Sequence, residues 1–524
     1  MQTFQLYEHA STVPATPYNA QDWQRGYESL KQEYDYWIDD IEGEIPQNLN
    51  GTLFRNGPGL LDINGQRIHH PFDGDGMIAK IVFKDGRAHF SNRFVRTKGY
   101  QEEQAAGRIL YRGVFGTQKP GGWLANAFDL RQKHIANTNV IYWGDKLLAL
   151  WEAAEPYRLD PYTLETLGLE YLDGLLDPGD AFAAHPRIDG ETERLVNFSI
   201  KPGLSSTITI YEFEPSGKLL TKHAHSVPGF AFIHDFAITP NYCIFFQNPV
   251  TFNPLPFVLG WRGAAECIKF NPKRPTQVII IPRNPKQPMQ LLQTEAGFVF
   301  HHANAFEQGD KIYLDSICYE SLPAVEAESD YRQTNFEALS PGQLWRFEIN
   351  LNNSQAEPWE RAGSSQAEPW QRAGSSQAEP WQRGVQRQIL ESRCCEFPWV
   401  NPKKVGQPYQ YLYLGAAHAP QGNAPLQAIL KLDLNSGTRE VWSAAPKGFV
   451  SEPVFVPRPE AMNEDDGWLL TLVYDSAHHR SDLAILDARD LNRGPVARLH
   501  LKHHVPYGLH GSFTSHCFDP LRSR

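Results

Sequence analysis

The chain has no long hydrophobic run. Hydrophobic residues make up 41% of its 524 residues, but none of its apolar segments approaches the ~20 residues that a transmembrane helix needs. The first residues also lack the basic and apolar regions of a secretory signal peptide. We therefore expect a cytoplasmic protein whose contact with membranes is peripheral.

Basic clusters and paired cysteines are also lacking. The net charge is -11, and no stripe of Lys and Arg is present. Because affinity for nucleic acid depends on clustered cations, we expect no nucleic-acid partner. The six cysteines include no CxxC pair, which fits a reducing compartment and argues against a disulfide framework.

Helical periodicity is scarce, and short β-rich runs joined by turn residues take its place. Four segments each read as two strands around a glycine-containing turn, namely residues 77–95, 139–152, 207–227 and 428–444. Hairpins that recur along the chain indicate a closed or radially repeated all-β architecture. The pattern favours a β-propeller, but no regular repeat gives the number of blades.

An exact repeat interrupts the β-rich pattern at 354–384. The sequence SQAEPW recurs there with a period of eleven residues, and each copy contains a proline and one tryptophan. A packed helix is therefore not expected. We interpret this segment as an insertion within a loop, without a catalytic role.

Two longer apolar segments, 114–135 and 248–266, are punctuated by glycine and proline. Such segments can simply pack on a sheet. Alternatively, they form an exposed apolar patch around an opening, which is typical of a membrane or ligand contact.

Several of the nineteen histidines lie in apolar, strand-like runs rather than in polar surroundings. These are His185, His234, His301, His302 and His510. Each alone is more often a hydrogen-bonded core residue than a ligand. A propeller, however, brings inner strands of different blades to one axis, and neutral imidazole is the commonest protein metal ligand.

The adjacent pair in FVFHHANAF cannot share one role. Consecutive strand residues face opposite sides, so only one of His301 and His302 can face the axis. Alternation places Phe300 on the side of His302. The pattern does not decide which histidine is the ligand.

Three glutamates lie in equally apolar stretches: Glu152, Glu396 and Glu452. Glutamate is almost never fully buried without a partner. The partner can be an arginine, such as Arg393 for Glu396. It can also be a metal-binding histidine, since such a ring usually gives its second nitrogen to a carboxylate.

The motifs together resemble the carotenoid cleavage oxygenases. The resemblance runs from the segment NAQDWQRGYESL to the segment HHVPYGLHGSF and includes GTLFRNGPG, HPFDGDGM, FAFIHDFAIT, FHHANAFE, LDSICYESLP and SRCCEFP. It implies one domain over residues 1–524. The implied fold is a seven-bladed β-propeller with long loops and a few short helices that cap an axial metal site.

The resemblance also implies a mononuclear, non-haem Fe(II) centre, with one ion per chain. It places the metal ligands at His185, His234, His301 and His510, and the carboxylates that hold three of these rings at Glu152, Glu396 and Glu452. His302 then has a structural role.

The activity implied by the resemblance is cleavage of an apocarotenoid by O2 at the 15,15' double bond, which gives retinal and a second aldehyde. Thr138 matches a residue close to an open coordination position. Phe115, Trp151, Phe232 and Phe300 are expected to line the substrate tunnel, although each can equally be an ordinary core residue. The alternatives are cleavage of another polyene or a stilbene-type bond, isomerisation, zinc hydrolysis, or a non-catalytic propeller.

Residues 514–524 extend beyond the part that matches the family. We expect this tail to be flexible, so that His516 within it does not compete for the metal. We also expect the protein to be a monomer that contacts the membrane through its two apolar segments.

Overall fold

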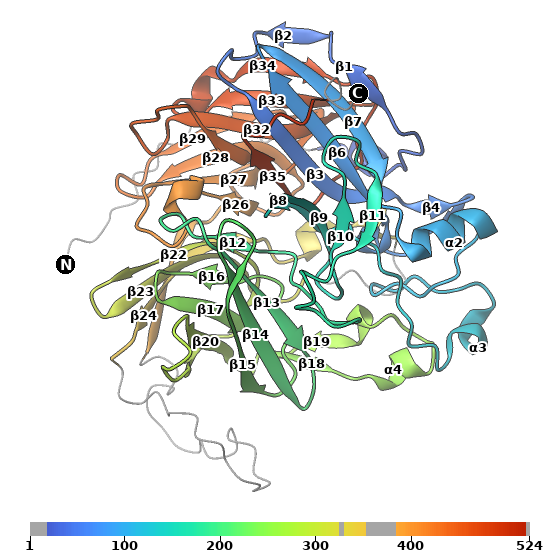
Figure 1. Ribbon diagram of the computed structural model, residues 1–524, viewed down its shortest axis with the longest axis vertical. Helices are drawn as coiled ribbons and strands as arrows, with labels where there is room; N and C mark the ends of the chain where they lie inside the picture. Colours follow the sequence, from blue (N-terminus) through green and yellow to red (C-terminus); the bar gives the residue numbers. More distant parts are fainter. Residues whose placement is uncertain (1–17, 324–329, 353–383, 520–524) are drawn as a thin grey trace, which may run out of the picture.

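The computed structural model describes residues 18–323, 330–352 and 384–519. Its strands form seven sheets of four to six strands arranged radially, which confirms the predicted seven-bladed β-propeller (Figure 1). Nearly all of the predicted repeat lies outside the described residues.

Blades 2 to 6 are four-stranded antiparallel sheets. Blade 2 contains β8 (Asn139–Trp143), β9 (Lys146–Leu150), β10 (Tyr157–Leu159) and β11 (Thr166–Leu169). Blade 3 contains β12 (Arg187–Ile188), β13 (Leu195–Lys201), β14 (Ser205–Phe213) and β15 (Leu219–Pro228). Blade 4 contains β16 (Ala237–Ile238), β17 (Tyr242–Gln247), β20 (Thr276–Pro282) and β21 (Gln290–Thr294).

The next two blades follow the same plan. Blade 5 contains β22 (Phe298–Gln308), β23 (Lys311–Tyr319), β24 (Gln343–Asn350) and β25 (Val385–Glu391). Blade 6 contains β26 (Cys395–Trp399), β27 (Tyr411–Ala417), β28 (Leu426–Asp433) and β29 (Arg439–Ser443). In both, the first strand is the inner one, at one end of the sheet order.

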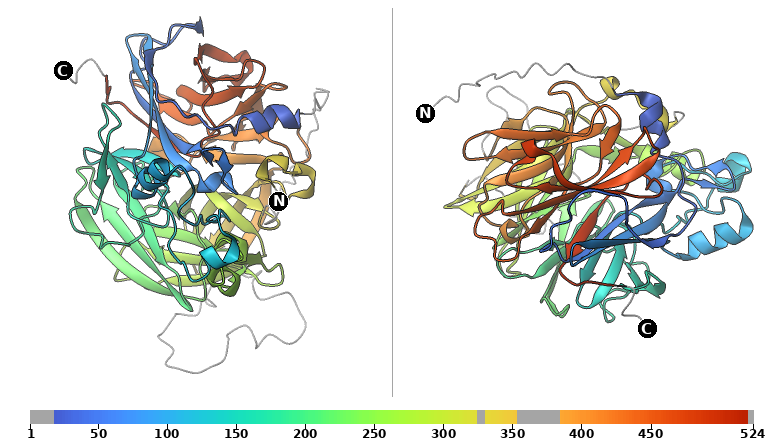
Figure 2. Two further views of the ribbon diagram at one scale, coloured as in Figure 1. Left: turned by 90° about the vertical axis from the view of Figure 1, so that its right-hand side faces the viewer. Right: turned by 90° about the horizontal axis from the view of Figure 1, so that it is seen from above.

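Blades 1 and 7 combine strands from distant parts of the sequence, and so close the ring. Blade 1 has the order β1 (Asp35–Trp37), β7 (Arg87–Phe94), β6 (Asp75–Lys84), β3 (Gly51–Leu60), β35 (Gly511–Thr514). Blade 7 contains β2 (Ile41–Gly43), β34 (Pro495–His500), β33 (Arg480–Asp487), β32 (Gly467–Asp475), β30 (Gly448–Val450) and β31 (Val454–Pro457). The blue and red strands consequently lie side by side (Figures 1 and 2).

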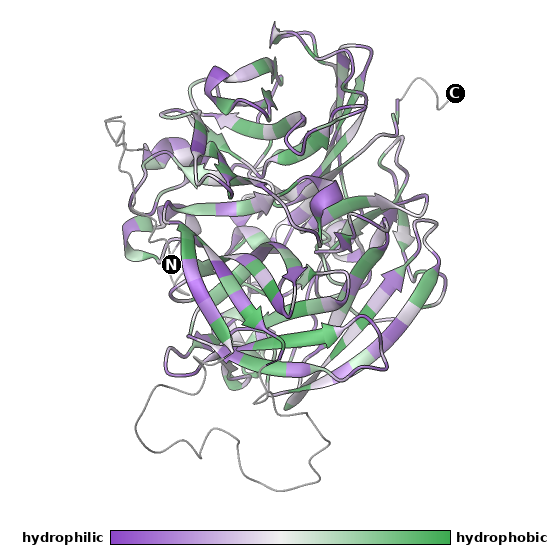
Figure 3. Cartoon of the chain, turned by 90° about the vertical axis from the view of Figure 1, so that its left-hand side faces the viewer, coloured by the Kyte–Doolittle hydropathy of each residue, from purple (hydrophilic) through white to green (hydrophobic). Residues whose placement is uncertain are grey.

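The four predicted hairpins are confirmed as β6–β7, β8–β9, β14–β15 and β28–β29. Buried aliphatic and aromatic side chains pack between neighbouring blades. One such cluster joins strands of blades 3 and 4 through Phe198, Ile210, Phe245 and Ile281. Hydrophobic and hydrophilic residues alternate along many strands (Figure 3), as expected for sheets that pack through their faces.

Helices are short and few in the described residues. They are α1 (Ala20–Arg25), α2 (Lys98–Ala106), α3 (Gly122–Asn126) and α4 (Leu255–Val258). The longest, α2, begins where Thr97 accepts a hydrogen bond from the Tyr100 N–H, and it ends at Gly107, whose φ is 62°. None of the described helices has the length and hydrophobicity that crossing a bilayer requires. Two-stranded ribbons are β4 (Asp62–Ile63) with β5 (Gln66–Arg67), and β18 (Val250–Phe252) with β19 (Ile268–Phe270).

The two predicted apolar segments lie next to each other. Helices α3 and α4 are drawn at the same side of the molecule (Figure 1), and the N–H of Phe128 donates to the C=O of Val258 at 2.7 Å. The fully buried guanidinium of Arg112 donates to the C=O groups of Asp129 and Arg262, and so joins the two segments. Their large apolar side chains are exposed, and we name them the apolar rim: Trp123, Leu124, Phe128, Leu130, Leu255 and Trp261.

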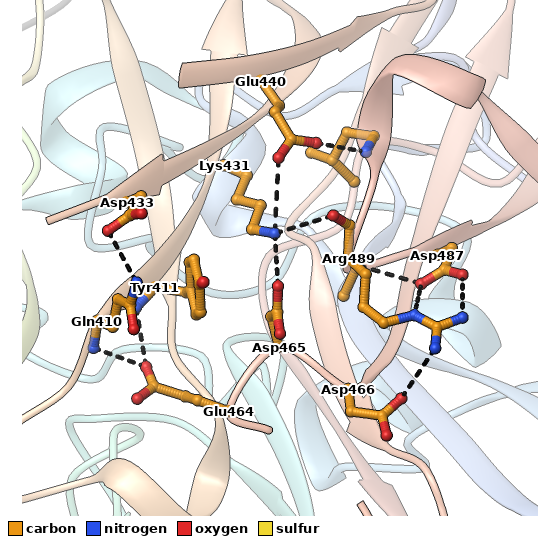
Figure 4. Close-up of polar contacts among 12 residues, drawn as sticks. Gln410, Tyr411, Lys431, Asp433, Glu440, Glu464, Asp465, Asp466, Asp487 and Arg489 are labelled. Atoms are coloured by element: carbon orange, nitrogen blue, oxygen red, sulfur yellow. Dashed lines mark hydrogen bonds and ion pairs between the residues drawn. The ribbon is translucent and has the colours of Figure 1, made fainter. Parts of the chain in front are cut away.

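A network of ion pairs joins blades 6 and 7 (Figure 4). The ammonium of Lys431, on β28, is buried and lies 2.8 Å from Asp465 and 3.2 Å from the C=O of Arg489. The neighbouring carboxylates are also paired, Glu464 with two backbone N–H groups of blade 6 and Asp466 with the Arg489 side chain at 3.7 Å. The consecutive acidic residues Glu464, Asp465 and Asp466 therefore help to hold blades 6 and 7 together.

The start of the C-terminal tail is anchored, contrary to the predicted flexibility. Phe518 is buried, with its ring 4.8 Å from that of Tyr142, and its C=O accepts a hydrogen bond from Lys80. Thr52 donates to the C=O of His516 at 2.7 Å. The His516 ring stacks on Phe518; it is outside the histidine cluster described below.

Candidate metal centre

Four histidines from four segments meet inside the ring of blades. His185 precedes β12, His234 precedes β16, His301 lies in β22, and His510 directly precedes β35. One ring nitrogen from each lies within 4.8 Å of the others. The structure therefore brings together the four predicted ligands.

Three of these rings are held by the three predicted glutamates. The Nδ1 atom of His234 lies 2.5 Å from Glu152, that of His301 lies 2.6 Å from Glu396, and that of His510 lies 2.8 Å from Glu452. A carboxylate at Nδ1 keeps the proton there and fixes the ring orientation. The Nε2 lone pairs are therefore available to a metal.

The HH pair is divided by irregular pairing in β22. Register shifts on either side of His302 let it pair with Ser316 while His301 projects to the centre. His302 is buried, and its Nδ1 atom lies 2.7 Å from the Ser316 hydroxyl. The structural position of His302 is as predicted.

Simple alternation is wrong for Phe300. Because the ladder is shifted here, Phe300 does not point away from His301. Its ring lies 5.7 Å from that of His234 and 6.4 Å from that of His301. Both consecutive residues therefore border the centre.

Burial favours neutral rings at His185 and His510, whereas the close contact of His301 with Glu396 favours an ionised pair. Burial lowers the pKa of His185 well below its usual value, and burial also lowers the pKa of His510. Burial is the largest influence on Glu396 and would raise its pKa, but the charge of His301 and the hydrogen bonds from His301, the Phe397 N–H and Tyr319 together lower it. For His301, burial would lower the pKa, but the charge of and hydrogen bond to Glu396, with the charges of Asp235 and Glu452, together raise it.

The donor set fits a divalent transition metal. The Nε2 atom of His301 is buried and has no hydrogen-bond partner, and those of His185 and His234 face each other at 2.8 Å. Buried polar atoms normally have partners, and nitrogen donors suit iron, zinc or copper. The negative field that raises the pKa of His301 would also attract a cation at this position.

Two of the glutamates have further partners that sequence reasoning missed. Arg55, on β3, is buried and pairs with Glu452, and it also donates to the C=O of Leu509 at 3.0 Å. The hydroxyl of Tyr319 donates to Glu396 at 2.7 Å. Both residues lie in motifs that carry the family resemblance, but their partners are hundreds or tens of positions away, so no local pattern reveals the contacts.

A cavity of about 350 Å³ adjoins the centre. Its wall is chiefly apolar and includes Trp23, Phe72, Tyr319, Phe336 and Phe397. The Phe397 ring lies 5.8 Å from that of His301 and 5.4 Å from that of His510. Its φ of 55° is unusual for a bulky residue, and such backbone strain clusters at functional sites.

Thr138 lies next to the fourth ligand, because its C=O accepts the His510 N–H at 3.2 Å. Phe115, Phe232 and Phe300 are half-buried, and Trp151 is buried. None of these four rings lines the 350 Å³ cavity. Phe115 contacts Phe72, and Phe300 contacts Tyr319, and both of these partners do line it.

Comparison with known proteins agrees with this geometry. Residues 27–515 match the family described as RPE65, retinal pigment epithelial membrane protein. Apocarotenoid-15,15'-oxygenase of Synechocystis sp. is 54% identical, over 95% of this chain and 96% of the relative. Isoeugenol monooxygenase of Pseudomonas nitroreducens is 31% identical, over 91% and 95%, respectively.

A solved structure, that of the cobalt-substituted Synechocystis apocarotenoid oxygenase, has a TM-score of 0.88 to this chain. The two sequences are 54% identical, and the match covers 95% of this chain and 99% of the chain in that structure. Family match, sequence identity and fold agree, so the chain belongs to the RPE65 family of carotenoid oxygenases.

Proposed function

We propose that the chain binds one Fe(II) ion through its four histidines and cleaves an apocarotenoid at the 15,15' double bond. The products are retinal and a second aldehyde. The observation that carries this proposal is the set of four converging imidazoles, three of them held at Nδ1 by glutamates. The 54% identity to an apocarotenoid-15,15'-oxygenase supports the substrate class.

The ligand set suits oxygen chemistry. His185, His234, His301 and His510 would hold the ion through neutral nitrogen donors, which would leave the full charge on a divalent metal. When bound, Fe(II) supplies the site for O2 activation. His185 and His510 contribute by staying neutral, because burial lowers the pKa of each.

The walls of the cavity would position the substrate and exclude water. A polyene offers almost nothing to hydrogen-bond, so an apolar cavity must hold it by shape. The bond that lies near the metal is then the bond that reacts. We assign this positioning to the cavity wall around Phe72, Tyr319 and Phe397, with Phe115 and Phe300 packed against it. Trp151 and Phe232 stay expected tunnel residues outside that cavity, and Thr138 is proposed to lie beside an open coordination position.

The apolar rim provides a route from the membrane to the site. Phe128 is 75% exposed and Leu124 is 72% exposed, which is unusual for adjacent large apolar side chains on a monomer surface. An apocarotenoid dissolves in the bilayer. A rim that enters one leaflet can receive it without passage through water.

The test is to purify the protein anaerobically with Fe(II), measure bound metal, and add an apocarotenal under O2. We expect about one iron per chain, as four ligands define one site, and aldehydes of retinal length. A folded protein that binds no iron and leaves the substrate unchanged would contradict the proposal. Such a result would favour a non-catalytic propeller.

One second substrate class follows from the comparisons. The isoeugenol monooxygenase that is 31% identical to this chain carries a name that points to a phenylpropene rather than a polyene. Isoeugenol and a hydroxystilbene therefore belong in the same assay. Faster turnover of either than of the apocarotenal would transfer the proposal to that class.

A further inference from the structure

Each of three ligand-bearing segments contributes one more residue to a common contact. Arg187 follows His185 by two positions, Asp235 follows His234 directly, and His302 follows His301 directly. One guanidinium nitrogen of Arg187 lies 2.5 Å from Asp235 and 2.7 Å from the C=O of His302. Segments of blades 3, 4 and 5 thus meet at one buried ion pair.

The Asp235 carboxylate also binds the backbone of the neighbouring segments. The Oδ2 atom of Asp235 accepts the His302 N–H at 2.8 Å, and its Oδ1 atom accepts the Phe236 N–H at 2.7 Å. The Nε of Arg187 donates to the Phe236 C=O at 2.9 Å. The pair therefore binds both the N–H and the C=O of His302, which directly follows a ligand, and of Phe236, which lies two positions after a ligand.

These backbone groups have no ladder partner on that side. Strand β22 is the end strand of blade 5, so its inner edge at His302 is open. Phe236 precedes β16 and lies outside the ladder. Buried backbone groups need partners, and here a carboxylate and a guanidinium provide them where a neighbouring strand would otherwise lie.

Fold stability alone is a weak reason for such a pair. The Asp235 side chain is 1% exposed and that of Arg187 is 20% exposed. Removing two charges from water costs about as much as their attraction returns, so buried pairs often add little net stability. What this pair does provide is a fixed relation between three backbone segments.

We infer that the Arg187–Asp235 ion pair is a positioning clamp for His185, His234 and His301. It holds the backbones of their segments, whereas glutamates hold the rings of His234 and His301. The fourth ligand is held separately, because Arg55 binds both Glu452 and the C=O of Leu509. The inference rests on the proposed metal centre and assigns two residues that do not bind the metal, although their charges act on the rings of His301 and His185.

The test uses Asp235→Asn and Co(II). Both carboxylate oxygens of Asp235 accept hydrogen bonds, one from Arg187 and His302 and the other from Phe236. The asparagine amide replaces one of these oxygens by an NH2 group, which cannot accept. At least one of the contacts is therefore lost in either orientation of the amide. Apo-protein is loaded with Co(II), and affinity and visible ligand-field absorption are measured. We expect affinity to fall by about 10–100-fold, as for other residues that orient ligands, with a shifted spectrum.

The matched control is Asp315→Asn. Arg346 and Asp315 form a bidentate pair at 2.7 Å with exposed fractions of 20% and 0%, but both lie within blade 5, on adjacent strands. This variant should be destabilised to a similar extent while it keeps wild-type Co(II) affinity and spectrum. Arg187→Lys retains the charge but offers one nitrogen instead of two. Its Co(II) affinity should lie between that of the wild type and that of Asp235→Asn.

Three outcomes would contradict the clamp. The first is wild-type Co(II) affinity and spectrum in Asp235→Asn, and the second is an equal change in Asp315→Asn. The third is failure of both Arg187→Lys and Asp235→Asn to fold, because the pair would then serve the fold itself. If the wild type binds no Co(II), the proposed function fails instead.

Discussion

The metal centre and the apolar rim are opposite kinds of surface built on one scaffold. At the centre, the His301 and Glu396 side chains are only 12% and 15% exposed and are bound to each other at 2.6 Å. At the rim, Trp123 and Leu124 are 54% and 72% exposed. The centre joins segments from four blades, whereas the rim is built from two loops.

Under the proposed function, the centre carries out the reaction and the rim receives the substrate. At the centre, most polar atoms have partners, so one change propagates through several hydrogen bonds. At the rim, each side chain acts mainly through the apolar area it offers, and such contributions add. Substitutions should therefore affect metal binding sharply at the centre and membrane binding gradually at the rim.

The largest effect should come from removing the predicted ligand His301, with its neighbour His302 as the control. His301→Ala removes a ligand, so we expect loss of bound iron and of turnover. His302→Ala should keep both, because Asp235 binds its backbone rather than its ring. Its cost should be about 1–3 kcal/mol of stability, from the unpaired Ser316 hydroxyl. Metal analysis and thermal unfolding check this; equal iron retention in both variants would contradict the ligand assignment.

A smaller effect is expected from the carboxylate that holds a ligand ring in place. Glu396→Gln leaves the shape of the side chain but removes the charge that holds the Nδ1 proton of His301. Iron affinity should fall by about 10–100-fold, as measured by competition with a chelator. Unchanged affinity would mean that the Tyr319 hydroxyl and the Phe397 N–H suffice to orient the side chain at position 396.

At the rim, the expected change is in location and not in chemistry. Serine at Trp123, Leu124 and Phe128 removes three exposed apolar side chains, each worth up to about 1.5–3 kcal/mol when fully buried in lipid. Binding to phospholipid vesicles, measured by co-sedimentation, should fall at least tenfold. Iron content and turnover of substrate in detergent should stay unchanged; a parallel loss of iron would show that rim and centre are coupled.

The smallest effect is expected from the repeat. Deletion of residues 365–375 removes one complete copy. Turnover, iron content and vesicle binding should all match the full-length protein. A large loss of any of them would assign the repeat a function and would add a third region to the comparison.

The sequence predicted the architecture well because hairpins are local. Glycine-containing turns between alternating runs identified β6–β7 and β14–β15 correctly. The ligand histidines and their glutamates needed the family resemblance, since partners such as His301 and Glu396 are far apart in the sequence. Alternation was right that the two adjacent histidines differ, and wrong about Phe300, because irregular pairing in β22 breaks the period of two.

Contacts between blades could not be predicted from residue patterns. Arg55 and Tyr319 lie in motifs that carry the resemblance, and Arg187 lies two positions after His185, but the partners of all three are fixed only when the ring closes. The cavity beside Phe397 has the same origin. Its volume depends on side chains from several blades, and no single stretch of sequence contains that information.

Ring closure also decides when the centre becomes complete. His510 directly precedes β35, the strand that closes blade 1 by pairing with β3. A chain in which these strands have not paired offers three of the four predicted ligands, and so would hold a metal more weakly. An ion that binds only the closed ring stabilises it by about 2.7 kcal/mol at a hundred times its Kd. Under the proposed function, metal loading and closure of the ring would therefore be one coupled equilibrium.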